Sequence, residues 1–463
     1  MGVLYNEITR NGLHYLDIIK YKNFGGKNMK KAKLISLMIS CVMTASLVAG
    51  CGSSSSTSTS TKPVTDNKPV KITMVNTKGE IQTQLEDAAK AFTKANPKIT
   101  LEIVPVPTGS SPFEKISAMY AAGNAPSLAM LDPGDIPKFK DKFLDLSSKK
   151  WVADASTGAL DAAKIDGKSY GFPLAIEGYG FIYNKTVMTK AKIDPKTITT
   201  QDSLEAAFKK VKATGVSPIV ISPMDWSLAG HLLPIAYTNQ GKNSVGTQKY
   251  LADLKAGTAN LSTNKSFNGL IKTFDLMKEY NLDKKAPLDK KYENNQQDIA
   301  TGKVGFWFMG NWTWTQIKAI DKTGDYGFIP VPTSNNAADY GNTQITAGPS
   351  KFIAIDKTNN DENQQAAAEK FLEWLIYSPA GQDILVNKCN AIPAFKNITL
   401  TLADPLGKSI KSYIDSSKII PTVPNLPADH WSVLGAEMQK YLAGKTNKEG
   451  LAKAIEAYWK SAQ

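Results

Sequence analysis

Apolar residues recur along residues 70–463 with two different periods. Leu85, Ala88, Ala89 and Phe92 fall at i, i+3, i+4 and i+7, which is the spacing of one face of an amphipathic helix. Short apolar runs bounded by polar or glycine-containing turns predict strands instead. The predicted strands are residues 70–75, 101–106, 127–131, 181–183, 217–222 and 304–308. The predicted helices are residues 85–92, 113–120, 203–214, 267–280, 362–377 and 450–460.

Strands and helices alternate along the chain, which is the order of parallel sheets joined by right-handed crossovers. The alternation up to residue 131 starts again near residue 181, so the pattern predicts two α/β lobes. Ligands of open α/β sheets bind beyond the carboxyl ends of the strands. That rule selects four loops rich in polar or aromatic residues: 76–80, 132–135, 223–226 and 309–312.

Composition narrows the class of protein. A length of 463 residues and a hydrophobic content of 42% suffice for two globular domains. The formal net charge is +13, but lysines alternate with acidic residues and form no basic cluster with interleaved aromatics, so no nucleic-acid partner is predicted. The three histidines and three cysteines lack the spacing of a metal site, and no nucleophile-elbow or cysteine-enzyme signature occurs. We therefore expect no metal, no cofactor and no enzyme.

Residues 29–51 have the pattern of an export signal. Lys30, Lys31 and Lys33 precede an apolar run over 34–48 that is short for a membrane-spanning helix. The run ends in LVAGC at 47–51, which closely resembles the bacterial lipobox, whose cysteine (here Cys51) carries a diacylglyceryl group. Two acyl chains anchor a protein stably. The sequence thus predicts a lipoprotein anchored at the outer face of the cell membrane.

The regions on either side of the lipobox have different expected roles. The Ser/Thr-rich segment 51–69 is predicted to be a flexible tether that holds the folded part away from the membrane. Residues 29–50 form the signal peptide that is removed. Residues 1–28 precede this complete signal peptide, which favours Met29 as the true start and marks 1–28 as a doubtful upstream extension.

Six short segments, in the same order, resemble landmarks of the extracellular solute-binding proteins of sugar ABC importers, the family that includes maltose-binding protein. In one of them Ser127 replaces the aspartate that is usual in the family. The six segments are 91–97 (AFTKANP), 123–127 (GNAPS), 166–173 (DGKSYGFP), 181–185 (FIYNK), 301–305 (TGKVG) and 310–314 (GNWTW).

The resemblance implies a two-lobed fold of the periplasmic-binding-protein type II, with three hinge crossings near Glu177, Ala347 and Asn390. The implied segments are 70–176 and 347–390 for the first lobe and 177–346 and 391–463 for the second. The ligand of such a protein lies between the lobes, which close on it. The resemblance also implies a monomer that delivers a sugar to the transmembrane subunits of an ABC permease.

Three tryptophans are candidate platforms for a sugar ring, because pyranose C–H groups face the negative π cloud of an indole. The resemblance assigns this role to Trp312 and Trp431, and Trp226 lies on one of the four selected loops. We expect Trp151, Trp374 and Trp459 to pack in the core or on the surface instead.

Carboxylates suit a polyol, since each accepts two or more charge-assisted hydrogen bonds from hydroxyl groups. The further candidate ligand contacts come from the four loops and the first two crossings: Thr77, Lys78, Glu80, Asp132, Asp135, Glu177, Asp225, Asn311 and Gly348. The small Gly348 would let the backbone approach the ligand closely.

Two alternatives remain open at this stage. Glu177 and Asp225 could form the carboxylate pair of a glycoside hydrolase. A non-sugar solute, such as a peptide or a polyamine, would also be bound by acids and aromatics. Only turnover or a ligand screen separates these from a sugar-binding protein.

Overall fold

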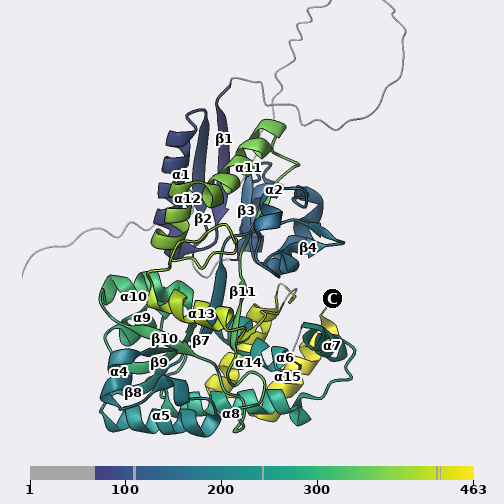
Figure 1. Cartoon of the computed structure of the whole chain (residues 1–463). Helices are drawn as coiled ribbons and strands as arrows, with labels where there is room; N and C mark the ends of the chain where they lie inside the picture. The colour runs from purple at the N-terminus through teal and green to yellow at the C-terminus, as the bar shows by residue number, and fades with distance from the viewer. Residues whose placement is uncertain (1–67, 108–110, 242–243, 424–425, 428, 463) are drawn as a thin grey trace, which may run out of the picture. The chain divides into compact units, whose positions relative to one another are not determined.

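The computed structural model describes residues 68–107, 111–241, 244–423, 426–427 and 429–462 (Figure 1). The upstream extension 1–28, the signal peptide 29–50, the lipidation site Cys51 and the tether up to residue 67 lie outside the described residues. Within the described ranges, no helix is both long and apolar enough to cross a membrane.

The first lobe is built on a five-stranded sheet with the order β2-β1-β3-β12-β6. The strands β1, β2 and β3 are parallel, whereas β12 is antiparallel to both of its neighbours. The strands are β1 (Val70–Asn76), β2 (Ile99–Pro105), β3 (Leu128–Leu131), β6 (Phe172–Pro173) and β12 (Phe352–Ile355), with a separate hairpin of β4 (Lys164–Ile165) and β5 (Lys168–Ser169). The helical elements are η1 (Gly79–Ile81), α1 (Gln82–Ala95), α2 (Pro112–Ala121), η2 (Pro133–Lys142), α3 (Trp151–Asp154), η3 (Asp161–Ala163), α11 (Glu362–Tyr377), α12 (Pro379–Asp383) and η8 (Ile384–Lys388).

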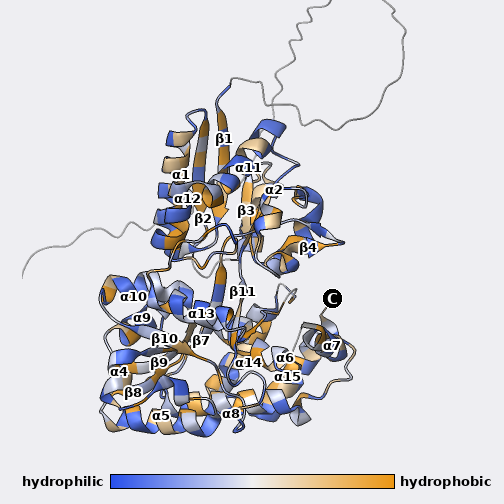
Figure 2. Ribbon diagram, in the orientation of Figure 1, coloured by the Kyte–Doolittle hydropathy of each residue, from blue (hydrophilic) through white to orange (hydrophobic). Residues whose placement is uncertain are grey.

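Helices cover both faces of this sheet because its central strands β3 and β12 are apolar and buried on both sides. Ile72 and Met74 of β1 pack with α1 and α11, where Phe92 meets Phe371 at a ring separation of 5.2 Å. Val75, on the opposite face of β1, packs with Ile116 of α2. The strand β3 is apolar throughout, whereas the covering helix α1 alternates between apolar and polar residues (Figure 2).

The second lobe has a mixed six-stranded sheet with the order β13-β11-β7-β9-β8, and β10 also pairs with β7. The strands are β7 (Ile176–Asn184), β8 (Ser217–Val220), β9 (Val304–Gly310), β10 (Tyr326–Ile329), β11 (Ile345–Pro349) and β13 (Ile419–Ile420). The sequence pattern predicted parallel sheets, but β7 is antiparallel to β9, β10 and β11. Only the pairs β8–β9 and β11–β13 in this lobe are parallel.

Helices surround the second sheet as well. The helical elements are α4 (Lys185–Lys190), η4 (Pro195–Thr197), α5 (Gln201–Ala213), η5 (Trp226–Leu232), α6 (Pro234–Thr238), α7 (Ser244–Lys255), η6 (Leu261–Thr263), α8 (Lys265–Tyr280), α9 (Tyr292–Ala300), η7 (Asn311–Thr313), α10 (Trp314–Ile320), α13 (Pro405–Asp415), α14 (His430–Leu442) and α15 (Lys448–Ser461). Local sequence explains several boundaries: α5 begins with a Thr200–Ser203 capping box and α11 with an Asp361–Gln364 capping box. The turn after α2 contains Gly123 at φ +70°, a conformation that glycine adopts without strain.

The chain passes between the two sheets at the junctions β6–β7 and β11–β12. The strands β7 and β11 run side by side there, with Glu177 opposite Gly348 and Gly178 opposite Ala347. We therefore propose that the first and second crossings lie at these two junctions, near Glu177 and Ala347.

For the third crossing we propose a position later in the chain than the one expected near Asn390. After Asn390 the chain still contacts the first lobe: Ser156 N–H donates to the Ala394 carbonyl, and the rings of Phe395 and Phe172 lie 4.8 Å apart. The chain then enters α13, whose Tyr413 hydroxyl donates to the carbonyl of Phe328 in β10. We therefore propose that the third crossing lies between residues 402 and 405, and that residues 391–402 belong to the first lobe.

Candidate functional site

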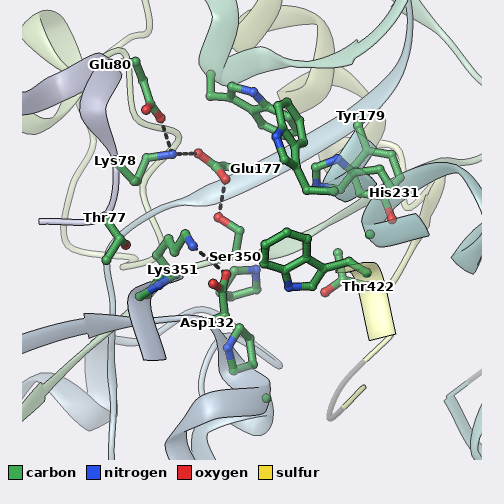
Figure 3. Close-up of a pocket in the computed structure, with 18 of the residues that line it drawn as sticks. Thr77, Lys78, Glu80, Asp132, Glu177, Tyr179, His231, Ser350, Lys351 and Thr422 are labelled. Carbon is green, nitrogen blue, oxygen red and sulfur yellow. Dashed lines mark hydrogen bonds and ion pairs between the residues drawn. The ribbon is translucent and has the colours of Figure 1, made fainter. Parts of the chain in front are cut away.

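A cleft with a volume of ≈ 560 Å³ is lined by residues of both lobes. The first lobe contributes the loops after β1 and β3, and the second lobe contributes η5, the start of α9 and the start of α10. The crossing strands β7 and β11 line it as well, so the cleft adjoins the hinge (Figure 3). Two of the four loops selected by the strand-end rule, 76–80 and 132–135, thus reach the cleft with several residues, and the loops 223–226 and 309–312 reach it through Trp226 and Trp312 alone.

Ten of the twelve residues expected to contact a ligand line this cleft. They are Thr77, Lys78, Glu80, Asp132, Asp135, Glu177, Trp226, Trp312, Gly348 and Trp431. The first lobe supplies charged and hydroxyl side chains, whereas the three tryptophans all come from the second lobe. The cleft therefore has a polar side and an aromatic side.

Asp225 and Asn311 do not line the cleft, contrary to the sequence-based expectation. The carboxylate of Asp225 accepts the N–H of Trp226 at 2.8 Å and caps η5, with its backbone packed against Gly435 of α14. Asn311 is buried, and its side-chain oxygen accepts the N–H of Gly178 at 2.8 Å. Both side chains accept hydrogen bonds from backbone N–H groups, so they position neighbouring elements.

The hinge ion cluster consists of Lys78, Glu80, Glu177 and Ser350. Lys78 Nζ lies 2.5 Å from Glu177 Oε1 and 2.6 Å from Glu80 Oε1, and Ser350 Oγ donates to Glu177 Oε2 (Figure 3). Burial lowers the pKa of Lys78, but the charges of Glu177 and Glu80 outweigh it and hold the pKa above its usual value. Burial raises the pKa of Glu177, but Lys78 and Ser350 together hold it below its usual value. Both oxygens of Glu177 are already engaged by protein groups.

A second ion pair lies on the first-lobe side of the cleft. Lys351 Nζ, which follows the second crossing, lies 2.6 Å from Asp132 Oδ1 (Figure 3). The neighbouring Asp135 is buried, and desolvation together with the charge of Asp132 raises its pKa to about 6. Lys138 approaches Asp135 at 3.7 Å and partly offsets this effect.

The aromatic side of the cleft is continuous. The ring of His231 lies 4.7 Å from Tyr179, 5.0 Å from Trp312 and 5.6 Å from Trp226. Trp226 in turn meets Tyr292 edge to face at 5.4 Å. Burial lowers the pKa of His231 to about 4, so its ring is neutral near pH 7. A neutral, mostly apolar wall of this kind can cover the C–H face of a ligand.

Trp431 extends the aromatic side across Gly230. A Cβ atom on Gly230 would lie 3.7 Å from the Cβ of Trp431 and 3.9 Å from the Cβ of Trp226. The glycine therefore separates the two indoles without filling the space between them.

A similar close approach occurs at Gly348, where a Cβ atom would lie 2.7 Å from Thr422 Oγ1. Gly348 thus brings the second crossing against the second-lobe residue Thr422.

Residues 87–413 match the family described as bacterial extracellular solute-binding protein. The match covers more than half of the chain and elements of both lobes. The chain belongs to this family. This family consists of extracellular binding proteins and not of enzymes. Membership in it implies that the protein is exported.

Relatives of this solute-binding protein cover almost its whole length. An uncharacterized ABC transporter extracellular-binding protein of Pyrococcus horikoshii is 24% identical over 410 residues, 85% of this chain and 88% of the relative. The galactooligosaccharide-binding protein of Bacillus subtilis is 24% identical over 447 residues, 92% of this chain and 97% of the relative. The structure of RafE of Streptococcus pneumoniae in complex with raffinose has a TM-score of 0.72 at 20% identity, covering 84% of this chain and 99% of RafE. That likeness confirms the two-lobed α/β fold of type II.

Several lining residues of the solute-binding protein were not predicted from its sequence. They are Tyr179, His231, Tyr292, Glu293, Gln296, Gln316, Ser350, Lys351 and Thr422. Tyr179 lies inside a mostly buried strand and His231 inside a helical turn, where a core role is the usual one. Ser350 and Lys351 come two and three residues after Gly348, so the second crossing itself was the available signal.

The structure also bears on the chemistry that the solute-binding protein can perform. Within the described residues, no cluster of His, Cys, Asp and Glu could hold a metal ion. The carboxylate pair considered for a hydrolase, Glu177 and Asp225, is not assembled in the cleft, because Asp225 caps η5 outside the lining.

Proposed function

We propose that this solute-binding protein captures an oligosaccharide in the cleft and delivers it unchanged to the transmembrane subunits of an ABC importer. The observation that carries the proposal is the arrangement of Trp226, Trp312 and Trp431 on one side of the cleft, opposite a polar first-lobe side. A sugar ring has the same division, with an apolar C–H face and a rim of hydroxyl groups. Cofactors have no part in this function.

The polar side has free hydrogen-bonding capacity for such a rim. Asp132 has one carboxylate oxygen outside its Lys351 pair, and Thr77 Oγ1 is buried without a hydrogen-bond partner among the described residues. Glu177 differs, since Lys78 and Ser350 occupy one oxygen each. We therefore assign direct contact to Asp132 and Thr77 and a bracing role to Glu177.

A ligand screen followed by a turnover assay tests the proposal. Raffinose, stachyose, a galactotriose, a tripeptide and spermidine are compared by thermal shift, since a ligand at 100 times its Kd adds about 2.7 kcal/mol of stability. We expect at least one neutral oligosaccharide to raise the Tm and to be recovered chemically intact after prolonged incubation. If only spermidine or only the peptide stabilised the protein, that solute would be the ligand in place of a sugar. Recovery of a cleaved sugar would show that the protein is a hydrolase.

We further propose that the folded part is a monomer that is attached to the outer face of the cell membrane through Cys51. The lipobox at residues 47–51 supports the anchor, and the Ser/Thr-rich segment that follows supports a tether. Such a tether lets the cleft reach a permease in the same membrane. An export signal at 29–50 agrees with the extracellular family.

A further inference from the structure

We infer that the cleft selects saccharides that are uncharged or carry an amino group, and rejects saccharides that carry a carboxylate or phosphate. This inference rests on the proposed saccharide function and specifies its substrate class. The argument comes from the number of charges that line the cleft and from how each of them is already paired.

Acidic side chains outnumber basic ones among the described residues of the lining. The carboxylates are Glu80, Asp132, Asp135, Glu177 and Glu293, and the ammonium groups are Lys78 and Lys351. His231 adds no positive charge near pH 7, because burial lowers its pKa to about 4. Field lines concentrate in a cleft with low-dielectric walls, so this excess of negative charge acts on whatever enters.

Neither lysine is available to an anionic ligand. Lys78 contacts the carboxylates of Glu80 and Glu177, and only 10% of its side chain is exposed. Lys351 contacts Asp132, and 18% of its side chain is exposed. An acidic sugar could recruit either ammonium only by displacing a carboxylate, which would then remain in the cleft without its partner.

The sequence contains no alternative anion clamp. Arg10 is the only arginine of the chain, and it lies far upstream of the folded part. Arginine is the usual bidentate partner of carboxylate and phosphate groups. The recognition of an acidic sugar would therefore depend entirely on the two lysines that are already paired.

The second lobe offers a carboxylate to an amino group instead. Glu293 lines the cleft from the first turn of α9, is exposed, and forms no ion pair with any described residue. The adjacent Tyr292 and its edge-to-face partner Trp226 provide π faces on the same side. A ligand ammonium near Glu293 would gain both a carboxylate and a cation–π contact.

Three ligands that differ in one substituent test the inference. The neutral oligosaccharide with the tightest binding in the screen is compared with two derivatives, in which one primary hydroxymethyl group is oxidised to a carboxylate or replaced by an aminomethyl group. We expect the carboxylate to bind at least about tenfold more weakly than the parent sugar, and the amine to bind within about threefold of it or more tightly. The difference should shrink at high ionic strength.

Asp132→Asn provides the matched variant. It removes the partner of Lys351 and one negative charge, so the carboxylate derivative should gain at least about threefold in affinity relative to the neutral sugar. Asp87→Asn is the control, because it removes the same charge from an exposed pair with Lys90 on α1 and should leave that ratio unchanged.

Each outcome decides a separate claim. Equal binding of the carboxylate and the neutral sugar overturns charge selection and leaves the saccharide function intact. Equal loss for the carboxylate and the amine also overturns it, because the cause would then be the changed shape. A failure of every neutral saccharide to bind removes the proposed function itself, and the inference with it.

Discussion

Lys78 and Glu177 join a loop of the first lobe to the first crossing strand through a contact of 2.5 Å between Nζ and Oε1. Ser350, directly after the second crossing strand, donates to the other oxygen of the same carboxylate. One buried side chain therefore ties together the loop after β1, the strand β7 and the residue that follows the strand β11. Glu177 sits where the lobes must rotate if they close on a ligand, so we regard it as a brace for the hinge.

Glu177→Gln should destabilise the protein strongly. The change removes the negative charge that faces a buried ammonium, although Lys78 keeps Glu80 as a partner. Breaking a buried ion pair from one side costs about 3–5 kcal/mol, and the remaining partner should reduce this to about 2–4 kcal/mol. Chemical denaturation measures the loss.

Glu102→Gln is the control for that measurement. It breaks an ion pair with Lys71 that is 2.7 Å long but more than half exposed on both sides. Exposed pairs contribute about 0–1 kcal/mol. If both variants lost the same small amount, the hinge ion cluster would have no special role in stability.

Trp312→Ala should weaken sugar binding by about thirtyfold, which corresponds to a lost anchor of about 2 kcal/mol. The indole packs on Gly310 and against His231, so some loss of stability is also expected. Trp312→Phe keeps an aromatic face, so its affinity for the sugar should lie between those of Trp312→Ala and the parent protein. Calorimetric titration gives the three affinities.

Trp374→Ala is the comparison at a structural tryptophan. Trp374 packs on Phe92 in the first lobe at 5.7 Å, outside the cleft lining. The substitution Trp374→Ala should lower the free energy of unfolding by about 2–4 kcal/mol, as expected for truncation of a large packed side chain. The Kd for the sugar should stay unchanged. A Trp312→Ala variant that binds like the parent would remove this indole from the proposed binding site.

Gly134→Ala should reduce ligand affinity without unfolding the protein. A Cβ atom at Gly134, in the loop after β3, would lie 2.6 Å from the carbonyl oxygen of Leu426 in the second lobe. Because that contact joins the two lobes, the added methyl group should keep them apart. In solution scattering the ligand should reduce the radius of gyration of the parent, and reduce it less in the variant. A tightly bound ligand that leaves the scattering of the parent unchanged would contradict closure.

His430→Gln should flatten the dependence of stability on pH. His430 is fully buried beside Tyr237, and burial lowers its pKa to about 3. Between about pH 6.5, where the unfolded histidine takes up a proton, and pH 3, only the unfolded state is protonated at this site. The parent therefore loses up to roughly 1.4 kcal/mol for each unit of acidification in that window.

Comparing the parent protein with His430→Gln isolates the contribution of His430 to the pH dependence of stability. Asp135 and Asp404, whose pKa values burial raises to about 6, change stability in the opposite direction, since the folded state takes up their protons first. Both aspartates are present in parent and variant, so their effect cancels in the difference. Parallel curves of unfolding free energy against pH would show that His430 does not titrate as described.

Cys51→Ala should release the protein from the membrane of a bacterial host. The thiol of Cys51 is the proposed site of diacylglyceryl attachment. Without this thiol, the protein cannot receive the lipid at this position. We expect loss of labelling by a radioactive or clickable fatty acid and a shift to the soluble fraction or the medium. Identical partitioning of both proteins would refute the anchor, whereas Cys389→Ala, in the buried interior, should stay at the membrane.

The sequence pattern was sufficient for elements whose stability is local. The helix predicted over 362–377 forms over the same residues as α11, since its capping box and apolar face are both visible in the sequence. The strand β12 was not predicted, because a four-residue apolar run acquires its identity only from its position between β3 and β6. The antiparallel course of β7 likewise depends on partners that are distant in sequence.

For the cleft too, the sequence predicted some features and left others undetermined. The strand-end rule selected loops that line the cleft, but it could not decide which residue within a loop faces inward. Asp225 and Trp226 are adjacent, yet the first caps η5 and the second lines the cleft, because the helical turn directs their side chains differently. Tyr179 and His231 were missed since their neighbours in sequence are those of buried core positions.

The central place of β12 in the first sheet has a consequence for biosynthesis. Its partners β3 and β6 are made early, but β12 leaves the ribosome only after the segment of the second lobe from β7 to β11. The sheet cannot close before then, and such long-range pairing makes folding slow. The same strand order that builds the hinge therefore leaves one edge of β3 unpaired until the chain from β7 to β11 has been synthesised.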